Sequence, residues 1–286
     1  MNGFINVLKP VGATASDVVV CVKHALHEKK VGHLGTLDPG AAGVLPVAVG
    51  QGTKLFNFLT NKVKYYRAFF TFGVTTDTLD SYGEVTERSS VLPTYEQVAT
   101  VLKQFEGAIE QAPPVYSAIS VGGVRAYKLA REGVDVQLKT RPVEVYSFTL
   151  IEQKSPDTFV VDIKCSGGTY IRSLARDVAQ ALGTVGYMSA LIRLQSGCFD
   201  IENAYTLDEI RVKLHECVLP LDYPLGDVEK YVFDDEKRFD DIDFGRKVRC
   251  DSFDGYRKIY CKDTFFGLGK CRDGFLDLEY YLKNAF

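Results

Sequence analysis

The chain has 286 residues, of which 46% are hydrophobic and 25% are charged, as in a folded protein that buries a sizeable core. Its net charge is −3, with residues 1–215 near neutral (22 Lys and Arg against 21 Asp and Glu) and residues 216–286 acidic (12 against 16). This balance does not by itself indicate a nucleic-acid-binding protein, which is usually basic, and no stretch approaches the roughly 18 apolar residues of a membrane-spanning helix.

Local sequence signals predict short strands and helices that are interspersed along the first 221 residues. In chain order they are a strand over 3–8, a helix over 16–27, a loop over 30–43, a strand over 44–49, a helix over 53–60, a strand over 64–73, helices over 94–105 and 126–131, strands over 143–152 and 158–165, and helices over 169–182 and 206–215. Ser16 is the predicted N-cap of its helix, and Thr169 is predicted to open the helix that runs to Leu182. Because no regular βαβ repeat is present, we expect an α+β fold with a mixed, largely antiparallel sheet.

A second, smaller unit is predicted at the C-terminus. Pro220 and Pro224 flank a turn-like stretch, and the charge balance changes at the same point. The residues that follow contain short β-like runs at 258–261, 265–268 and 275–278. We therefore divide the chain into a domain over 1–221 and a small β-rich module over 222–286.

The cysteines and the first ten residues indicate in which cellular compartment the protein is expected. Seven cysteines, an odd number without a C-x-x-C pair, favour neither a disulfide framework nor a metal site. The first ten residues lack the basic start and the long apolar stretch of a secretion signal, and they have the pattern of a strand. We expect a cytoplasmic protein without a bound metal.

The stretch GHLGTLDPGAAGVLP at residues 32–46 is the segment richest in chemical information. Its small residues allow a ligand or another backbone to approach closely, and Pro39 restricts Asp38 to extended conformations. A carboxylate held in this way can serve as a nucleophile, a general base or a metal ligand. On local chemistry alone, the start of an ordinary Asp-Pro turn is the more common reason for such a residue.

Nucleotide-binding loops are the other common use of glycine-rich segments. The sequence GQGTK at residues 50–54 lacks the order of a P-loop, in which Lys directly follows Gly and Ser or Thr comes next. No G-x-G-x-x-G fingerprint is present either. Both observations argue against a nucleotide hydrolase or a dinucleotide-dependent enzyme.

Eight collinear blocks over about residues 3–200 resemble the TruB family of tRNA pseudouridine synthases. The blocks are 32–46, GQGTK at 50–54, KYYR at 64–67, TDTLD at 76–80, PVYSA at 114–118, RP at 141–142, CSGGTYIR at 165–172 and LIRL at 191–194. The resemblance implies isomerisation of a uridine to pseudouridine in the T-arm loop of tRNA, at position 55. It implies a pseudouridine synthase catalytic domain followed by a PUA-like RNA-binding module, with tRNA as the partner. No cofactor and no protein partner are expected, and we expect a monomer.

The resemblance also assigns three catalytic residues. Asp38 corresponds to the family's essential nucleophile. Tyr66 corresponds to the tyrosine that stacks on the flipped base and is implicated in removing the proton from C5. Arg172 is similar to the arginine that pairs with the catalytic carboxylate.

Five further positions correspond to substrate-binding residues of the family. His33 matches a histidine that takes part in base flipping, and Tyr170 a residue that hydrogen-bonds near the catalytic pair. Leu191 matches a hydrophobic wall of the pocket. Lys54 and Asp80 match positions that support the RNA contact and the active-site network.

Each of these residues also has an ordinary structural interpretation when it is taken alone. Tyr66 fits simple core packing, Leu191 fits the core, and His33 and Lys54 fit solvated surface positions. Only the joint occurrence of the blocks favours the functional interpretation. The alternatives that remain are an RNA-binding protein or folding chaperone without catalysis, and a phosphate-binding metabolic enzyme.

Overall fold

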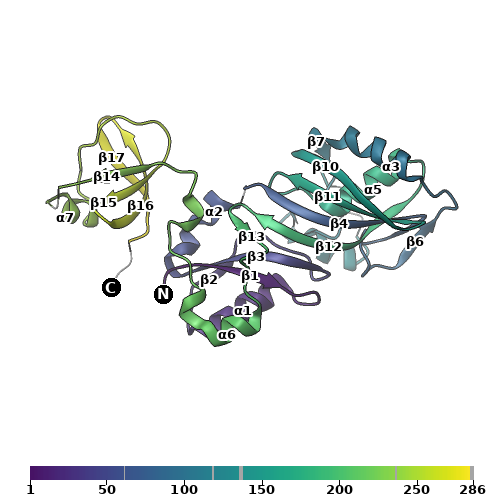
Figure 1. The fold of residues 1–286 in the computed structure, drawn as a ribbon, viewed down its shortest axis with the longest axis horizontal. Helices are drawn as coiled ribbons and strands as arrows, with labels where there is room; N and C mark the ends of the chain where they lie inside the picture. The colour runs from purple at the N-terminus through teal and green to yellow at the C-terminus, as the bar shows by residue number, and fades with distance from the viewer. Residues whose placement is uncertain (61, 118, 135–137, 236, 284–286) are drawn as a thin grey trace.

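The protein is described here by a computed structural model that covers residues 1–60, 62–117, 119–134, 138–235 and 237–283. Figure 1 shows a large part built on a twisted sheet and a smaller part formed by the C-terminal residues. The predicted α+β class with a mixed, largely antiparallel sheet is confirmed. No helix among these described residues is long and apolar enough to cross a membrane.

The central sheet has nine strands. They are β1 (Gly3–Lys9), β2 (Val31–His33), β3 (Ala41–Val49), β4 (Lys64–Phe72), β7 (Gly107–Gln111), β10 (Arg141–Ser155), β11 (Thr158–Cys165), β12 (Gly186–Ser196) and β13 (Phe199–Asp200). The order along the sheet is β1-β3-β12-β4-β11-β10-β7, with β2 beside β3 and β13 beside β12. The pairing of β3 with β12 is parallel, and the other pairings of these strands are antiparallel. Strands from distant parts of the chain therefore meet at β12 and β4, in the middle of the sheet.

Four helices share one hydrophobic core with the sheet: α1 (Ala15–Leu26), α3 (Tyr95–Leu102), α5 (Ile171–Ala181) and α6 (Leu207–Lys213). In α5, buried apolar residues recur at the spacing of one helical face, at Ile171, Leu174, Ala175, Val178 and Ala179. This face packs onto the sheet and fixes the position of the first turn of α5. The remaining elements of this part are η1 (Gly50–Leu55), α2 (Phe56–Leu59), β5 (Val74–Thr76), β6 (Val85–Arg88), η2 (Lys103–Phe105), β8 (Ser120–Val121), β9 (Val124–Arg125), α4 (Ala126–Arg131), η3 (Leu214–Cys217) and η4 (Tyr223–Leu225).

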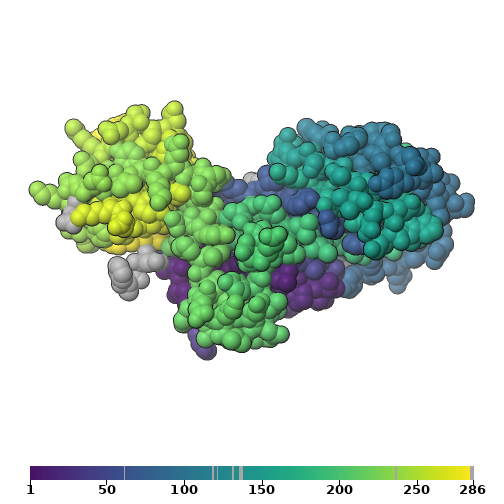
Figure 2. Space-filling model, viewed as in Figure 1, coloured from purple at the N-terminus to yellow at the C-terminus, as the bar shows by residue number. Residues whose placement is uncertain are grey.

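The C-terminal residues form a four-stranded sheet of their own, which Figure 2 shows as a lobe joined to the rest through a narrower middle. Its elements are β14 (Lys230–Phe233), α7 (Lys237–Asp243), β15 (Arg257–Cys261), β16 (Thr264–Arg272) and β17 (Phe275–Tyr281). Leu268 and Leu282 share a second core cluster with Phe4 and Leu55, so the small sheet packs on the start of the chain. A domain boundary near residue 222 remains a prediction.

One predicted helix cap is wrong, and a second helix begins later than predicted. The first helix is capped by Thr14, not Ser16, because Thr14 accepts the Asp17 amide at 3.0 Å and donates its own amide to the Asp17 carboxylate at 2.8 Å. Helix α5 begins after Tyr170, because the hydroxyl of Thr169 donates to the Ser166 carbonyl at 3.0 Å and does not cap the helix.

The largest omission of the prediction is strand β12, which lies in a region where no element was expected. Its sequence, GYMSALIRLQS, contains Met, Leu, Ala, Arg and Gln, which are good helix formers. Tertiary pairing with β3 and β4 overrides that local preference. The predicted loop over 30–43 also contains β2 and the first residues of β3.

Candidate active site

A cleft of about 680 Å³ opens between the loop that joins β2 to β3, strands β4 and β12, and the first turn of α5. Six of the eight residues predicted from the sequence line it, and they are Asp38, Tyr66, Arg172, His33, Tyr170 and Leu191. A cleft of this size is typical of a small-molecule or single-nucleotide site.

Asp38 lies in the loop of residues 34–40, called here the aspartate loop. Leu34 and Leu37 of this loop are buried and anchor it in two different core clusters. The side chain of Asp38 stays 36% exposed. The loop thus holds its apolar residues inward and its carboxylate in the cleft.

Lys9 supports the aspartate loop from the end of β1. Its buried ammonium donates to the carbonyl oxygens of Pro10, Ala13 and Pro39, at 2.9, 2.6 and 3.4 Å. Burial is the main cause that lowers the pKa of Lys9 to about 8, and the nearby Asp38 carboxylate acts in the opposite direction. The sequence analysis gave Lys9 no role.

Arg193 of β12 also supports the aspartate loop, through hydrogen bonds to the loop backbone. Its guanidinium is fully buried and donates to the carbonyl oxygens of Gly35, Thr36 and Val44, at 3.2, 3.2 and 2.7 Å. Close pairing of β3 with β12 requires glycine at position 43, where φ is +110° and a Cβ would come within 2.2 Å of the Arg193 carbonyl oxygen. An arginine inside an apolar run was the one sequence signal for this role.

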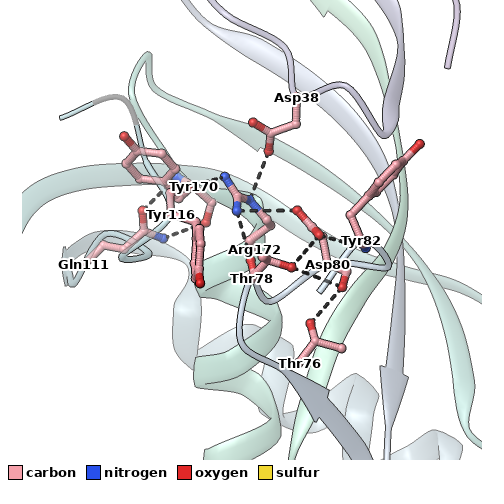
Figure 3. Close-up of polar contacts among 9 residues, drawn as sticks. All are labelled: Asp38, Thr76, Thr78, Asp80, Tyr82, Gln111, Tyr116, Tyr170 and Arg172. Carbon is pink, nitrogen blue, oxygen red and sulfur yellow. Dashed lines mark hydrogen bonds and ion pairs between the residues drawn. The ribbon is translucent and has the colours of Figure 1, made fainter. Parts of the chain in front are cut away.

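Arg172 faces Asp38 and forms an ion pair with it, as Figure 3 shows. Its Nε lies 3.0 Å from Oδ2 of Asp38, and one terminal nitrogen lies 3.4 Å from Oδ2 of Asp80. The two terminal nitrogens donate to the carbonyl oxygens of Thr78 and Tyr116 at 2.9 and 3.0 Å. The two hydrogen bonds to carbonyl oxygens fix the guanidinium, so its positive charge is held beside the Asp38 carboxylate as an ion pair.

Asp80 lies outside the lining of the cleft and reaches the site through Arg172. Its Oδ1 accepts the Thr78 hydroxyl at 2.6 Å and the Tyr82 amide at 3.0 Å. The hydroxyl of Thr76 donates to the main-chain carbonyl oxygen of Asp80 at 2.7 Å. Leu79 adopts a left-handed conformation with φ of +60°, which turns the chain sharply between Thr78 and Asp80. Asp80 is therefore connected to Asp38 only through Arg172 among these contacts.

Tyr66 and Leu191 form the apolar wall of the cleft. Tyr66 lies on β4 opposite Arg193 of β12, and it is 6% exposed. Burial raises the pKa of Tyr66 above its ordinary value, so the phenol stays protonated at neutral pH. Leu191 and Met188 of the neighbouring strand also line the cleft. Met188 was not identified from the sequence.

Tyr170 is held at the N-terminus of α5 by a side chain that sequence reasoning missed. The fully buried amide of Gln111 donates to the Tyr170 carbonyl oxygen at 3.0 Å and accepts the Tyr170 amide at 2.8 Å. The guanidinium of Arg141 lies over the Tyr170 ring, 4.5 Å from its centroid. Gln111 thus satisfies a backbone group at a helix end where no side chain of the helix does so.

His33, Lys54 and Lys64 differ in their positions relative to the cleft. His33 lines it, and burial, followed by the charge of Arg193, lowers the pKa of His33. Lys54 does not line the cleft, because its ammonium donates to the Tyr281 carbonyl oxygen of the C-terminal sheet at 3.0 Å. Lys64 lines the cleft without having been predicted to do so, and burial lowers the pKa of its ammonium to about 8.

The described residues contain no group of three or more His, Cys, Asp or Glu side chains that could hold a metal ion. The chemistry available in the cleft includes one carboxylate, a fixed guanidinium and a buried aromatic ring, beside the His33 imidazole and the Lys64 ammonium. Such a set can supply a nucleophile in a site that also accepts a planar ring.

Two family models match this chain. Residues 23–171 match the model described as TruB family pseudouridylate synthase (N terminal domain), and residues 172–226 match the tRNA pseudouridylate synthase B C-terminal domain. The fold and the cleft are accordingly those of a pseudouridine synthase, an enzyme that isomerises a nucleoside. More narrowly, the chain belongs to the TruB family.

Two relatives agree with this assignment, and one solved structure has a similar fold. The chain is 48% identical over 212 residues to tRNA pseudouridine synthase B of Caldanaerobacter subterraneus subsp. tengcongensis, covering 74% of each chain. It is 37% identical over 281 residues to the protein of that name from Clostridium perfringens strain 13, covering 94% of this chain and 95% of the relative. A chain from the structure of an H/ACA RNP bound to a substrate RNA containing 2′-deoxyuridine has the same fold, with a TM-score of 0.74 at 23% identity over 98% of this chain and 84% of that chain.

Proposed function

We propose that this enzyme converts the uridine at position 55, in the T-arm loop of tRNA, into pseudouridine, with Asp38 as the nucleophile. The relatives named tRNA pseudouridine synthase B support tRNA as the substrate. The observation that carries the catalytic assignment is the 3.0 Å contact between Arg172 and Asp38 in a cleft that is also lined by Tyr66.

The target base reaches Asp38 only after it leaves the stack of the folded RNA. Extrusion of a base costs a few kcal/mol, and stacking on an aromatic ring returns roughly 1–3 kcal/mol. Tyr66 presents its ring next to Leu191 and Met188 in the cleft, so it can supply that stacking surface. His33, which also lines the cleft, is proposed to assist entry of the base.

The reaction breaks the C–N bond between the ribose and N1 of uracil and forms a C–C bond between the ribose and C5. A proton leaves C5 and N1 gains one, so the product is an isomer and no group is lost. The Asp38 carboxylate attacks the ribose or the base, or assists formation of a glycal; these paths remain open. Burial keeps the Tyr66 phenol protonated in the site without RNA. We therefore assign the Tyr66 ring to stacking on the extruded base.

Other parts of the proposal concern the whole molecule. Residues 222–286 are proposed to be a PUA-like module that binds RNA away from the chemistry, and Lys54 to support the RNA contact. Lys54 contacts that module at Tyr281, which makes it suited to linking the two parts. We also propose a cytoplasmic monomer that works without a cofactor or a protein partner.

The assignment is tested with Asp38→Asn on a T-arm stem-loop transcript. The change keeps the shape of the side chain but removes the carboxylate, so RNA affinity should stay within a few-fold while pseudouridine is no longer formed. Asp208→Asn, whose side chain is 89% exposed on α6, is the matched control and should retain full activity. Retained RNA binding with no product from the unaltered enzyme would instead support a non-catalytic RNA chaperone.

A further inference from the structure

An exposed tyrosine lies directly against the aspartate loop. The side chain of Tyr82 is 64% exposed, and its ring lies on Gly40, where a Cβ would come within 2.4 Å of a ring carbon. Figure 3 shows the Tyr82 ring beside Asp80, with its hydroxyl pointing away from Asp80 and Arg172. Tyr82 thus lies at the rim of the cleft and does not line it.

The backbone that carries Tyr82 is closely fixed. Its amide donates to the Asp80 carboxylate at 3.0 Å, and that carboxylate also faces Arg172. The next residue, Gly83, has no room for a side chain, because a Cβ would come within 2.2 Å of Asp77 and 2.3 Å of Thr78. The turn between β5 and β6 therefore holds the backbone of Tyr82 in one place. Ligand binding at this tyrosine then costs little additional backbone conformational entropy.

A second exposed apolar side chain lies next to the aspartate loop. The amide of Gly12 donates to the Pro39 carbonyl oxygen at 2.8 Å, and its neighbour Val11 is 61% exposed. Val11 and Tyr82 thus lie on segments that touch Pro39 and Gly40. Exposed apolar groups at the rim of a cleft are suited to contact unpaired bases.

We propose that Tyr82 is a stacking platform for a nucleotide next to the target uridine in the bound RNA. The inference rests on the proposed function, because it requires an RNA loop from which one base has been extruded. Extrusion leaves the neighbouring base without a stacking partner, and the ring of Tyr82 replaces that partner. Stacking on an aromatic ring tolerates any base, so Tyr82 contributes affinity and not the chemical step.

The test compares Tyr82→Ala and Tyr82→Phe with Tyr95→Ala, a control at a 40% exposed tyrosine that does not line the cleft. The probe is a T-arm stem-loop RNA that carries 2-aminopurine on one side of the target uridine or on the other. Measured quantities are the Kd, the fluorescence of the bound probe and the single-turnover rate at saturating RNA. Circular dichroism checks that each variant is folded.

Tyr82→Ala should weaken binding roughly 5- to 150-fold, restore the fluorescence of one of the two probes and leave the saturated rate within a few-fold. Tyr82→Phe and Tyr95→Ala should behave like the unaltered enzyme. Unchanged affinity and quenching in Tyr82→Ala would overturn the inference, and so would a loss in Tyr82→Phe equal to that in Tyr82→Ala, because the hydroxyl would then make the contact. Failure of the unaltered enzyme to form pseudouridine would count against the proposed function and not against this contact.

Discussion

The fully buried guanidinium of Arg193 donates its Nε hydrogen to the carbonyl oxygen of Val44 at 2.7 Å, and this bond ties β12 to β3 beneath the aspartate loop. The same side chain reaches Gly35 and Thr36. Arg193 thus holds the chain on both sides of Asp38, at residues 35–36 and at residue 44.

Replacement of Arg193 by Met should destabilise the fold, because three backbone carbonyls would lose their donor in a buried site. At ~1–3 kcal/mol for each unsatisfied group, the free energy of unfolding should fall by at least about 3 kcal/mol. Urea denaturation measures this change. Arg211→Met, at a side chain that is 58% exposed, is the control and should change stability by no more than about 0.5 kcal/mol. Equal unfolding midpoints for Arg193→Met and the unaltered protein would contradict the supporting role.

Asp80→Asn should slow the chemical step although Asp80 lies outside the cleft lining. Without its charge, the guanidinium of Arg172 loses one of the two carboxylates that fix it. A displacement of about 1 Å in a reacting group can cost ~100-fold in rate, so we expect a loss of roughly 10- to 100-fold in the saturated single-turnover rate. Asp77→Asn is the control, because Asp77 lies in the same turn and accepts the Glu84 amide.

The double variant Asp80→Asn with Arg172→Lys separates a shared role from two independent ones. If Asp80 acts only through Arg172, the double variant should be no slower than Arg172→Lys alone. Multiplied losses would show that Asp80 has a separate function in the reaction.

Lys64 should make stability depend on pH in the alkaline range. Its folded pKa of about 8 lies below the unfolded value of 10.5, so the unfolded chain binds more protons between these pH values. Stability from this group therefore rises as pH increases from 8 to 10.5. The difference in unfolding free energy between the unaltered protein and Lys64→Met should move in favour of the unaltered protein by up to about 3 kcal/mol over this window. A difference that does not change with pH would show that the ammonium is not desolvated.

The C-terminal sheet should unfold together with the rest of the chain. Leu268 of β16 is fully buried in the core cluster that contains Phe4 and Leu55. Leu268→Ala should therefore lower the stability by roughly 2–5 kcal/mol and shift a single melting transition in calorimetry. Val212→Ala, at an 82% exposed residue, should leave the transition unchanged. Two separate transitions, of which only one shifts, would show that the module is thermodynamically independent.

Strands β4, β10 and β11 were predicted well, because aromatic and β-branched residues make up most of β4 and β11 and most of residues 143–152 in β10. The sequence did not predict β12, whose helix-forming residues are held in the sheet by partners from distant parts of the chain. Arg193 lies on that strand, so its support of the aspartate loop depends on a pairing that local patterns do not encode.

The candidate site was predicted from collinear motifs and not from spacing. Asp38, Tyr66 and Arg172 come from a loop, a strand and a helix, and only the sheet topology brings them to one cleft. Gln111 could not be identified in the same way, because a buried glutamine has no sequence signature until its partner is known. Lys54 illustrates the opposite case, since the residue matches a motif but its ammonium contacts the C-terminal sheet.

Nucleotide-resolved pseudouridine mapping of total tRNA tests the central claim most directly. The measurement uses a strain without this protein, complemented with either the unaltered chain or Asp38→Asn at matched protein levels. We predict that position 55 is modified with the unaltered chain and carries an unmodified uridine with Asp38→Asn. Modification of position 55 by the Asp38→Asn protein, or its absence with the unaltered chain, would contradict Asp38 as the nucleophile of a tRNA pseudouridine synthase.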